Sequence, residues 1–295
     1  MAPRFNQLRF HFVSADGRPV RRPIPLHVLR GVFLHFVSTV DPSLAGRLHG
    51  GGGIPPYTSR LLVDGPNIHV TFTLFSKVLN DVLKDFIMQS TPVSFQIGSV
   101  DAMLLKVSLE AIDTGAFIDA AVPVRKFRLV FKTPAYFKSK EGDIVLFPRP
   151  ELLFKNLARI WNELGHYETL DTDALADWCK HHVRVTSYQL ETQSTYLGKQ
   201  GQGRRTVTGF KGLATFSVDA GAGDGDVPAP AAGGDATATA ALPPMTFPRV
   251  LDMLARFGEH ANVGGNRTTG LGAIRYRREG VFSKREAPVE ASPDK

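Results

Sequence analysis

The 295-residue chain contains one cysteine, Cys179, so it cannot form an internal disulfide. This scarcity is typical of proteins in a reducing compartment, and we expect a cytoplasmic protein. No apolar run approaches the ~18 residues that a membrane helix needs. Residues 1–12 mix polar and apolar side chains and lack the apolar region of a signal peptide. We therefore expect no membrane association.

Motifs for metals and cofactors are also missing. Cys179, His181 and His182 lie close together, but a structural zinc site usually has four ligands and the sequence offers no second cluster. No G-x-G-x-x-G follows a predicted strand, which disfavours a dinucleotide site. The string His49-Gly50-Gly51-Gly52 occurs in some esterases, but their G-x-S-x-G element is absent. We expect neither a metal nor a cofactor.

Basic residues outnumber acidic ones, 35 to 28, which gives a formal charge of +7 and a pI near 9.6. A strongly basic chain favours nucleic acid or another anionic surface as its partner. Hydrophobic residues make up 43% of the sequence, enough for substantial cores.

Apolar periodicity predicts two successive units with the order β-α-β-β-α-β. The elements expected in the first unit are strands at 8–13, 60–63, 68–72, 94–97 and 103–112, and helices at 25–40 and 77–88. A turn at 43–48 and a loop at 49–58 follow the first helix. The elements expected in the second are strands at 125–131, 183–191, 207–218 and around 274, and helices at 150–164, 173–181 and 248–257.

This order predicts an α+β protein with two tandem ferredoxin-like (RRM-like) domains. Each domain would be a four-stranded antiparallel sheet with helices on one face. We place the domains at residues 1–120 and 121–280, followed by a tail at 281–295. Residues 219–244 are rich in Ala, Gly, Pro and Asp without periodicity, which is typical of a disordered insertion.

The most informative stretch is a glycine-rich loop at 262–272, between the last helix and the last strand. Glycines allow close approach of a ligand, and successive N–H groups in such a turn suit an anion. Arg267 and the hydroxyls of Thr268 and Thr269 add charge and donors. Leu271-Gly272 replaces the Lys-Ser/Thr of a P-loop, which disfavours a single nucleotide. A tight structural turn is the alternative interpretation.

The loop resembles the C-terminal G-h-G-x-x-x-x-x-G-h-G signature (h, apolar) of the Cas-six family, the RAMP endoribonucleases that process CRISPR repeat RNA. Asn262 stands in place of the first glycine. Further resembling blocks occur in the same order as in the family, at 29–34, 48–50, 131–134, 146–151 and 209–212.

The resemblance places the catalytic histidine at His49 and implies that Tyr57 orients the phosphate or the nucleophile. Arg30 falls where many relatives carry a second catalytic side chain, and would stabilise charge rather than donate a proton. If that register is shifted, His27 or His35 takes the role, although helical geometry disfavours His35.

RNA would be held mainly through its phosphates. The residues expected to contact it are Lys199, Arg204, Arg205, Gly264, Gly265, Asn266, Arg267, Gly270 and Arg275. The resemblance implies metal-independent cleavage of CRISPR repeat RNA by 2′-OH attack that leaves a 2′,3′-cyclic phosphate. We expect this RNA to form a stem-loop. The resemblance also implies delivery of product to a Cascade-type or Csm/Cmr-type effector. The sequence leaves open whether the protein is a monomer or a homodimer. The alternative is a non-catalytic RAMP subunit that coats guide RNA.

Overall fold

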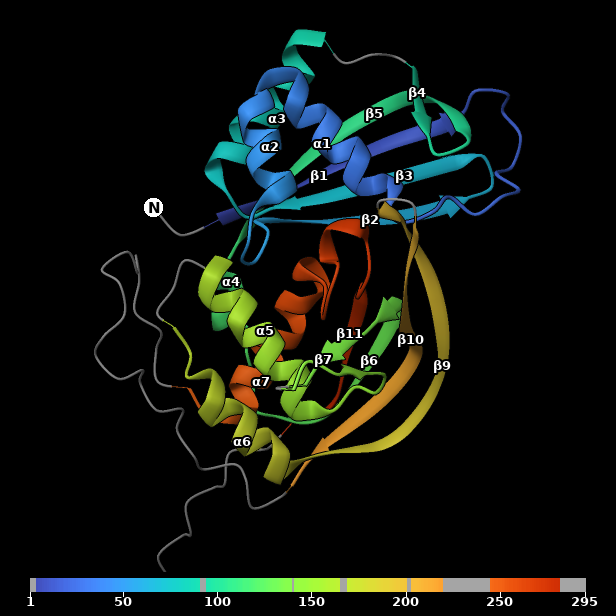
Figure 1. Cartoon of the computed structure of the whole chain (residues 1–295). Helices are drawn as coiled ribbons and strands as arrows, with labels where there is room; N and C mark the ends of the chain where they lie inside the picture. Colours follow the sequence, from blue (N-terminus) through green and yellow to red (C-terminus); the bar gives the residue numbers. More distant parts are fainter. Residues whose placement is uncertain are drawn as a thin grey trace, which may run out of the picture.

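The computed structural model describes residues 4–90, 94–139, 141–164, 169–200, 203–219 and 245–281. Two antiparallel sheets, each covered by helices on one face, lie one above the other (Figure 1). The α+β class predicted from the sequence is confirmed. No helix within the described ranges is both long and apolar enough to cross a membrane. The predicted insertion and tail lie almost wholly outside the described residues.

The first sheet contains five strands in the order β2-β3-β1-β5-β4. The elements of this half are β1 (Arg4–Ser14), α1 (Val28–Val40), α2 (Pro42–Gly50), β2 (Tyr57–Asp64), β3 (Asn67–Leu74), α3 (Lys77–Ser90), β4 (Ser94–Ile97) and β5 (Val100–Asp113). The prediction of four strands was wrong for this half. The short β4 forms a hairpin with β5 and adds a fifth strand outside the ferredoxin-like set.

Alternation along β1 explains which face the helices cover. Leu8, Phe10 and Phe12 are buried, and they point to the side of the sheet on which the buried face of α1 packs. Helix α1 contributes Phe33 and Phe36 to this core at helical spacing. The periodicities read from the sequence therefore produce one compact layer of helices on one layer of strands.

The segment after α1 differs from its prediction. The turn expected at 43–48 is the helix α2, and it continues to Gly50. Asp41 caps this helix, since its carboxylate accepts the Leu44 N–H at 2.8 Å, and Pro42 occupies the first turn. An Asp-Pro pair that ends one helix is also a good start for the next. His49 consequently lies in the last turn of a helix rather than in a loop.

The second sheet has the order β11-β6-β10-β9. The elements of this half are α4 (Gly115–Asp119), β6 (Val124–Ala135), β7 (Phe137–Lys138), β8 (Ile144–Val145), α5 (Pro150–Leu164), α6 (Thr172–His182), β9 (Val183–Gln200), β10 (Gly203–Val218), α7 (Phe247–Ala261), the 3-10 turn η2 (Arg267–Thr269) and β11 (Ile274–Val281). Its four strands match the ferredoxin-like order, and β7 and β8 form a separate small hairpin.

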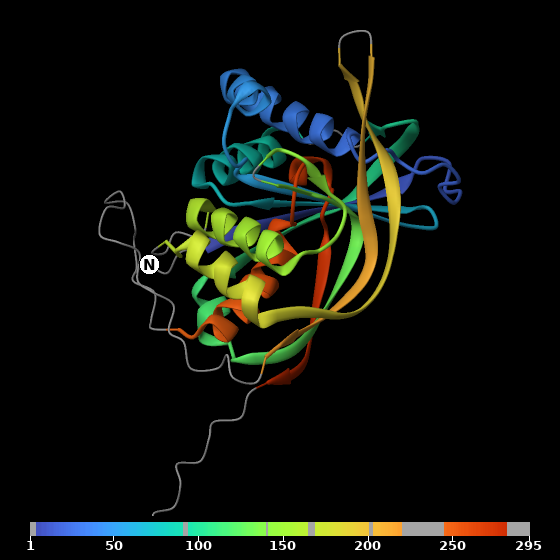
Figure 2. The same ribbon diagram turned by 60° about the horizontal axis from the view of Figure 1, so that its bottom comes forward.

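The β9–β10 hairpin is longer than the sequence pattern predicts and reaches the first half of the molecule (Figure 2). Near its end, the Tyr196 carbonyl lies 3.2 Å from Nδ1 of His27, the residue that precedes α1. The two rings meet edge to face at 4.9 Å. The hairpin therefore links the second sheet to the start of α1.

A shared aromatic cluster joins the two halves. Phe5 of β1 packs against Phe117 and against Phe257 of α7, with ring centroids 6.0 and 6.3 Å away. His260, at the end of α7, also contacts the Phe5 ring, and its Nδ1 lies 2.9 Å from the Gln7 amide nitrogen. Helix α7 thus packs on its own sheet and on the first strand of the chain.

His260 makes this interface sensitive to pH. Burial, and then the charges of Arg60, Arg9 and Arg256, lower its pKa to about 4. The unfolded chain, with a pKa near 6.5, binds the proton that the folded chain rejects, so stability falls as the pH drops between these values. We expect a loss of about 2 kcal/mol in unfolding free energy between neutral pH and about pH 5.

Urea unfolding across this pH range, for the native chain and for His260→Gln, measures the effect. The glutamine variant should lose less stability on acidification, because it has no imidazole to protonate. Equal losses in the two proteins would contradict the assignment.

Candidate functional site

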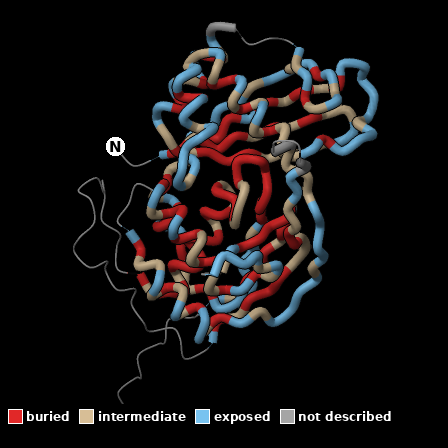
Figure 3. Tube along the Cα trace, in the orientation of Figure 1, coloured by how far each residue is buried: buried red, intermediate tan, exposed pale blue. Residues whose placement is uncertain are grey.

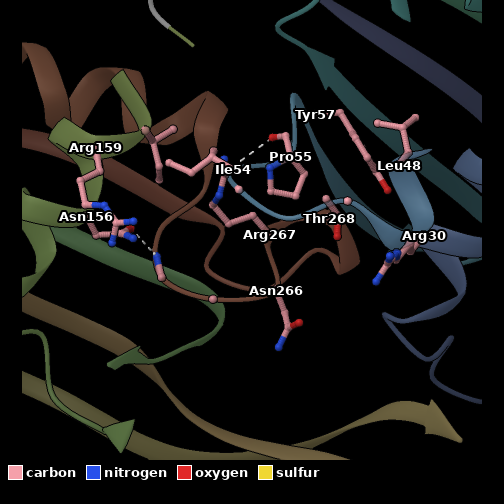
Figure 4. A pocket seen from close by; sticks show the side chains of 15 residues that line it. Arg30, Leu48, Ile54, Pro55, Tyr57, Asn156, Arg159, Asn266, Arg267 and Thr268 are labelled. Atoms are coloured by element: carbon pink, nitrogen blue, oxygen red, sulfur yellow. Dashed lines mark hydrogen bonds between the residues drawn. The ribbon is translucent and has the colours of Figure 1, made fainter. Parts of the chain in front are cut away.

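A cleft of about 330 Å³ opens between the two halves, beside the glycine-rich loop (Figure 4). Its walls come from the first turn of α1, the last turn of α2, the start of β2, helix α5 and the glycine-rich loop. The residues that line it are Arg30, Leu48, Gly51, Gly53, Ile54, Pro55, Tyr57, Asn156, Arg159, Ile160, Gly264, Gly265, Asn266, Arg267 and Thr268. Three of these are arginines and none is acidic, so the cleft suits an anion.

The loop is buried where it passes between the two halves (Figure 3). Gly264 and Gly265 allow it to lie against Tyr136, because a Cβ at either position would come within 2.3 Å of that residue. Asn266 adopts a left-handed conformation with φ of 55°, and its amide donates to the Tyr136 hydroxyl at 2.7 Å. The glycines are therefore required by packing within the chain.

The glycine amides of this loop are not the free anion-binding donors that the sequence suggests. The N–H of Gly264 donates to Oδ1 of Asn156 at 2.8 Å, and that of Gly265 to the Tyr136 carbonyl at 3.2 Å. The N–H of Gly270 donates to the Arg267 carbonyl at 3.1 Å. These three donors are satisfied within the chain and are not free to bind an anion.

Arg267 is also occupied by the chain itself. Its side chain is buried, and it donates to the carbonyls of Ala261 at 2.8 Å and Pro55 at 3.3 Å. Burial lowers the pKa of this guanidinium to about 10, so it stays charged at neutral pH. Since Pro55 precedes β2, Arg267 holds the loop to the first half of the molecule while it faces the cleft.

Asn262 has backbone angles that a residue other than glycine rarely adopts, with φ of 55° and ψ of 167°. Its fully buried side chain accepts from Nε of Arg60 at 2.9 Å and donates to the Ser59 carbonyl at 3.2 Å, both in β2. The residue that replaces the first glycine of the signature therefore makes a contact that glycine could not make.

Arg30 and Tyr57 bring polar groups to the cleft wall opposite Arg159 (Figure 4). The Tyr57 ring stacks on Phe33 at 3.7 Å, and its buried hydroxyl makes no hydrogen bond of good geometry among the described residues, although Thr268 and Arg30 lie beside it. Burial raises its pKa to about 12, although the Arg30 charge opposes this. Nε of Arg30 is likewise buried and unpartnered within the described part of the chain. Buried polar atoms of this kind usually form a hydrogen bond with a ligand or with water.

His49 lies at the rim of the cleft. Its carbonyl accepts from Nη2 of Arg30 at 2.9 Å, a contact that satisfies a carbonyl at the end of α2. Its neighbours Leu48 and Gly51 line the cleft, whereas the exposed His49 ring does not. The structure thus brings Arg30 and His49 together, with Tyr57 on the cleft wall.

The other predicted contacts are spread more widely. Arg205 of the hairpin is exposed and lies close enough to Tyr136 for its charge to oppose the rise in pKa that burial causes there. The side chains of Lys199 and Arg204 lie outside the described part of the structure. Arg275 is exposed and follows the buried Ile274, so it faces away from the helices and is not part of the cleft.

Asn156 and Arg159 of α5 were not among the residues predicted from the sequence. They line the cleft on the side opposite Arg30, and Asn156 also fixes the Gly264 amide. In the sequence, both residues occupy polar positions of an amphipathic helix, which gives no sign of a role in binding. Only the folded chain shows that this helix flanks the loop more than a hundred residues later.

Comparisons with known proteins show what the chain resembles in sequence and in fold. The sequence profile of the CRISPR-associated endoribonuclease Cas6 family matches residues 129–274. Two proteins named CRISPR-associated endoribonuclease Cas6, from the Mycobacterium tuberculosis strains CDC 1551 / Oshkosh and ATCC 25618 / H37Rv, are each 30% identical over 153 residues. These residues make up 52% of this chain and 39% of each relative, so the match spans well under half of the relatives' length.

Solved structures share the fold. A Cas6 product complex has a TM-score of 0.68 at 17% identity and covers 92% of this chain and 100% of its own. A Thermus thermophilus Cas6 has a TM-score of 0.63 at 17% identity, with coverage of 94% and 99%. In sequence over residues 129–274 and in fold over most of its length, the chain is similar to Cas6 proteins of the RAMP type.

Asn262 provides a test of how the loop is held. Asn262→Gly relieves the unfavourable backbone angles but leaves Nε of Arg60 and the Ser59 carbonyl without their buried partner. We expect it to lower the unfolding free energy by about 2 kcal/mol. Asn266→Gly is the matched control: it relieves a similar φ and loses one partly buried bond, so it should cost less than about 1 kcal/mol. Urea unfolding measures both, and equal losses would contradict the role given to Asn262.

Proposed function

We propose that this protein is a metal-independent endoribonuclease that cuts CRISPR repeat RNA next to the cleft between its two halves. The 2′-OH of the nucleotide at the cut attacks the adjacent phosphate, and the 5′-oxygen leaves. The products carry a 2′,3′-cyclic phosphate and a 5′-hydroxyl. The proposal extends the similarity to Cas6 proteins to the activity of this chain.

The lining of the cleft is the observation that carries the proposal. Arg30, Arg159 and Arg267 supply positive charge, while no lining residue among those described is a carboxylate. A phosphodiester gains from such surroundings, and a divalent cation, which prefers carboxylate oxygens, does not. The Tyr57 hydroxyl and Nε of Arg30, neither of which makes a hydrogen bond of good geometry among the described residues, would donate hydrogen bonds to the ligand.

The reaction needs a group to take the proton of the 2′-OH and one to protonate the leaving oxygen. Imidazole suits either task at neutral pH. His49 is exposed at the rim and is held next to Arg30 through its own carbonyl. Phosphate bound by Arg30 would therefore lie close to the imidazole-bearing turn of α2. Arg30 then offsets charge that builds up on the phosphate during attack.

The rest of the RNA would follow the positively charged surface beyond the cleft. Arg205 lies near Tyr136, so the hairpin offers phosphate contacts beside the loop. We propose that Lys199 and Arg204, which flank the end of the same hairpin, extend this surface. Arg275 faces the other side of the second sheet and would serve only an RNA that wraps around it. Cascade-type or Csm/Cmr-type effector proteins would receive the product.

A second candidate is a non-catalytic RAMP subunit that coats guide RNA. One observation favours it: the His49 ring does not line the cleft, although its sequence neighbours do. Both candidates require RNA binding, so cleavage separates them.

Labelled repeat RNA in EDTA, with the native chain and with His49→Ala, tests the proposal. The native chain should cut, and the alanine variant should cut at least about 100-fold more slowly while it binds RNA as before, because only proton transfer is lost. The control is His35→Ala, since His35 is exposed on α1 and does not line the cleft. It should cut at the native rate.

The outcomes are distinct. Undiminished cutting by His49→Ala would contradict the role of His49. Cutting that requires a divalent cation would contradict metal independence. RNA binding without cutting by any of the three proteins would favour the coat subunit.

A further inference from the structure

Helix α5 forms one wall of the cleft, and two of its polar side chains lie side by side there (Figure 4). Asn156 and Arg159 are three residues apart, so they share one face of the helix, about one turn from each other. The opposite wall carries Arg30 and Tyr57, beside which we place the phosphate at the cut. The α5 wall is therefore positioned to contact a nucleotide attached to that phosphate.

The contact of Asn156 with the glycine-rich loop fixes the orientation of its amide. Oδ1 accepts the Gly264 N–H at 2.8 Å. A backbone N–H can only donate, so the oxygen must be the end of the amide that meets the loop. Nδ2 is then the end that is left for a ligand. In the described part of the chain, no oxygen accepts a hydrogen bond from it.

Arg159 is available for a ligand in the same way. Its side chain is exposed and lines the cleft. Within the described ranges it forms no ion pair and no side-chain hydrogen bond. A guanidinium has several N–H groups in one plane and no acceptor. Since Oδ1 of Asn156 is already bonded, the two side chains together offer a ligand donors rather than acceptors.

A pair of donors distinguishes between the bases of RNA. On the edge that carries N7, guanine presents two acceptors, N7 and O6. Adenine presents N7 and a donor, N6, which would point at other donors. The two-bond contact between an asparagine and adenine needs both ends of the amide, and here the oxygen is bonded to the loop. Cytosine presents a donor, and uracil presents a single acceptor. Guanine is therefore the base that matches this wall.

We propose that Asn156 and Arg159 bind N7 and O6 of an unpaired guanine next to the phosphate at the cut, and so determine the base preference of the site. This inference rests on the proposed function, which places that phosphate beside Arg30. Ile54 and Pro55 line the cleft between the two walls and give the base an apolar surface (Figure 4). The guanine is unpaired because an RNA helix holds this edge in a groove that side chains do not enter.

A series of repeat RNAs tests the contact, each with one guanosine replaced by 7-deazaguanosine, which lacks N7. Fluorescence anisotropy measures binding to His49→Ala, in which cleavage is slow, and the native chain is used to measure cleavage in EDTA. At one guanosine next to the cut, the replacement should weaken binding about tenfold. Adenosine at that position should weaken it about 50-fold. Inosine retains N7 and O6, so it should bind as guanosine does.

Substitutions in α5 show which side chains carry the preference. Arg159→Lys keeps the charge but loses the planar pair of donors. Asn156→Asp keeps an oxygen for the Gly264 N–H and replaces the donor with an acceptor. Each should reduce the preference for guanosine over 7-deazaguanosine to about twofold. Comparing the two RNAs within one variant cancels effects of total charge. Arg125→Lys is the matched control, because Arg125 is exposed on β6 outside the cleft, and it should keep the native preference.

The other outcomes contradict the inference. Equal binding of every 7-deazaguanosine RNA and the parent overturns it, and so does a loss with inosine as large as that with adenosine. If Arg159→Lys weakens both RNAs equally, Arg159 contacts a phosphate rather than a base. Circular dichroism establishes that each variant is folded.

The two proposals fail separately. Cleavage by the native chain without any preference for guanosine would leave the proposed function intact and overturn the base contact. Binding that depends on N7 and on Arg159, without cleavage by the native chain, would support the base contact and contradict the proposed activity.

Discussion

The contact between the glycine-rich loop and strand β2 is the constraint on which the rest of the structure depends. The loop belongs to the second half of the chain and β2 to the first, and their bonds are buried. The Ser59 hydroxyl donates to the Thr268 carbonyl at 2.9 Å, and Asn262 bridges Ser59 and Arg60. Buried polar groups are costly without partners, so neither segment can move away without leaving several unsatisfied. This contact fixes the width of the cleft.

The loop therefore holds the halves together and shapes the cleft, while other side chains provide its free charge. Arg267 donates hydrogen bonds to the carbonyls of Ala261 and Pro55. Arg30 and Arg159 stand on the two sides of the cleft, one from each half of the chain (Figure 4). The glycines allow the loop to lie against Tyr136. This division explains why a loop rich in glycine and arginine can be well packed and still border an anion site.

Much of the fold could be predicted, because it rests on local periodicity. The alternation of Phe127, Leu129 and Phe131 in β6 and the apolar faces of α3 and α5 are visible in the sequence, and so is the ferredoxin-like order. The helix α2 was missed because an Asp-Pro pair both ends and begins helices. The fifth strand was predicted as a segment, but its pairing at the edge depends on the tertiary fold.

The site was less accessible from the sequence. Motif resemblance singled out His49, Tyr57 and Arg30, and two of these line the cleft. It could not show that the amides of Gly264 and Gly265 are already bonded, since their partners Asn156 and Tyr136 lie far away in the chain. Nor could it show that Arg159 faces the cleft. Which donors remain free for a ligand is decided by tertiary contacts, and periodicity carries no information about them.

The central claim is that RNA supplies its own nucleophile at this cleft, with the protein providing proton transfer and positive charge. The most direct measurement compares a repeat RNA with one that differs by a single 2′-deoxyribose at the nucleotide whose 2′-OH attacks, in EDTA. The account predicts that the deoxy substrate is bound but left intact, while mass spectrometry of the all-ribose product finds a 2′,3′-cyclic phosphate. Cleavage of the deoxy substrate at the same position, or a product that ends in a free 3′-hydroxyl, would contradict it.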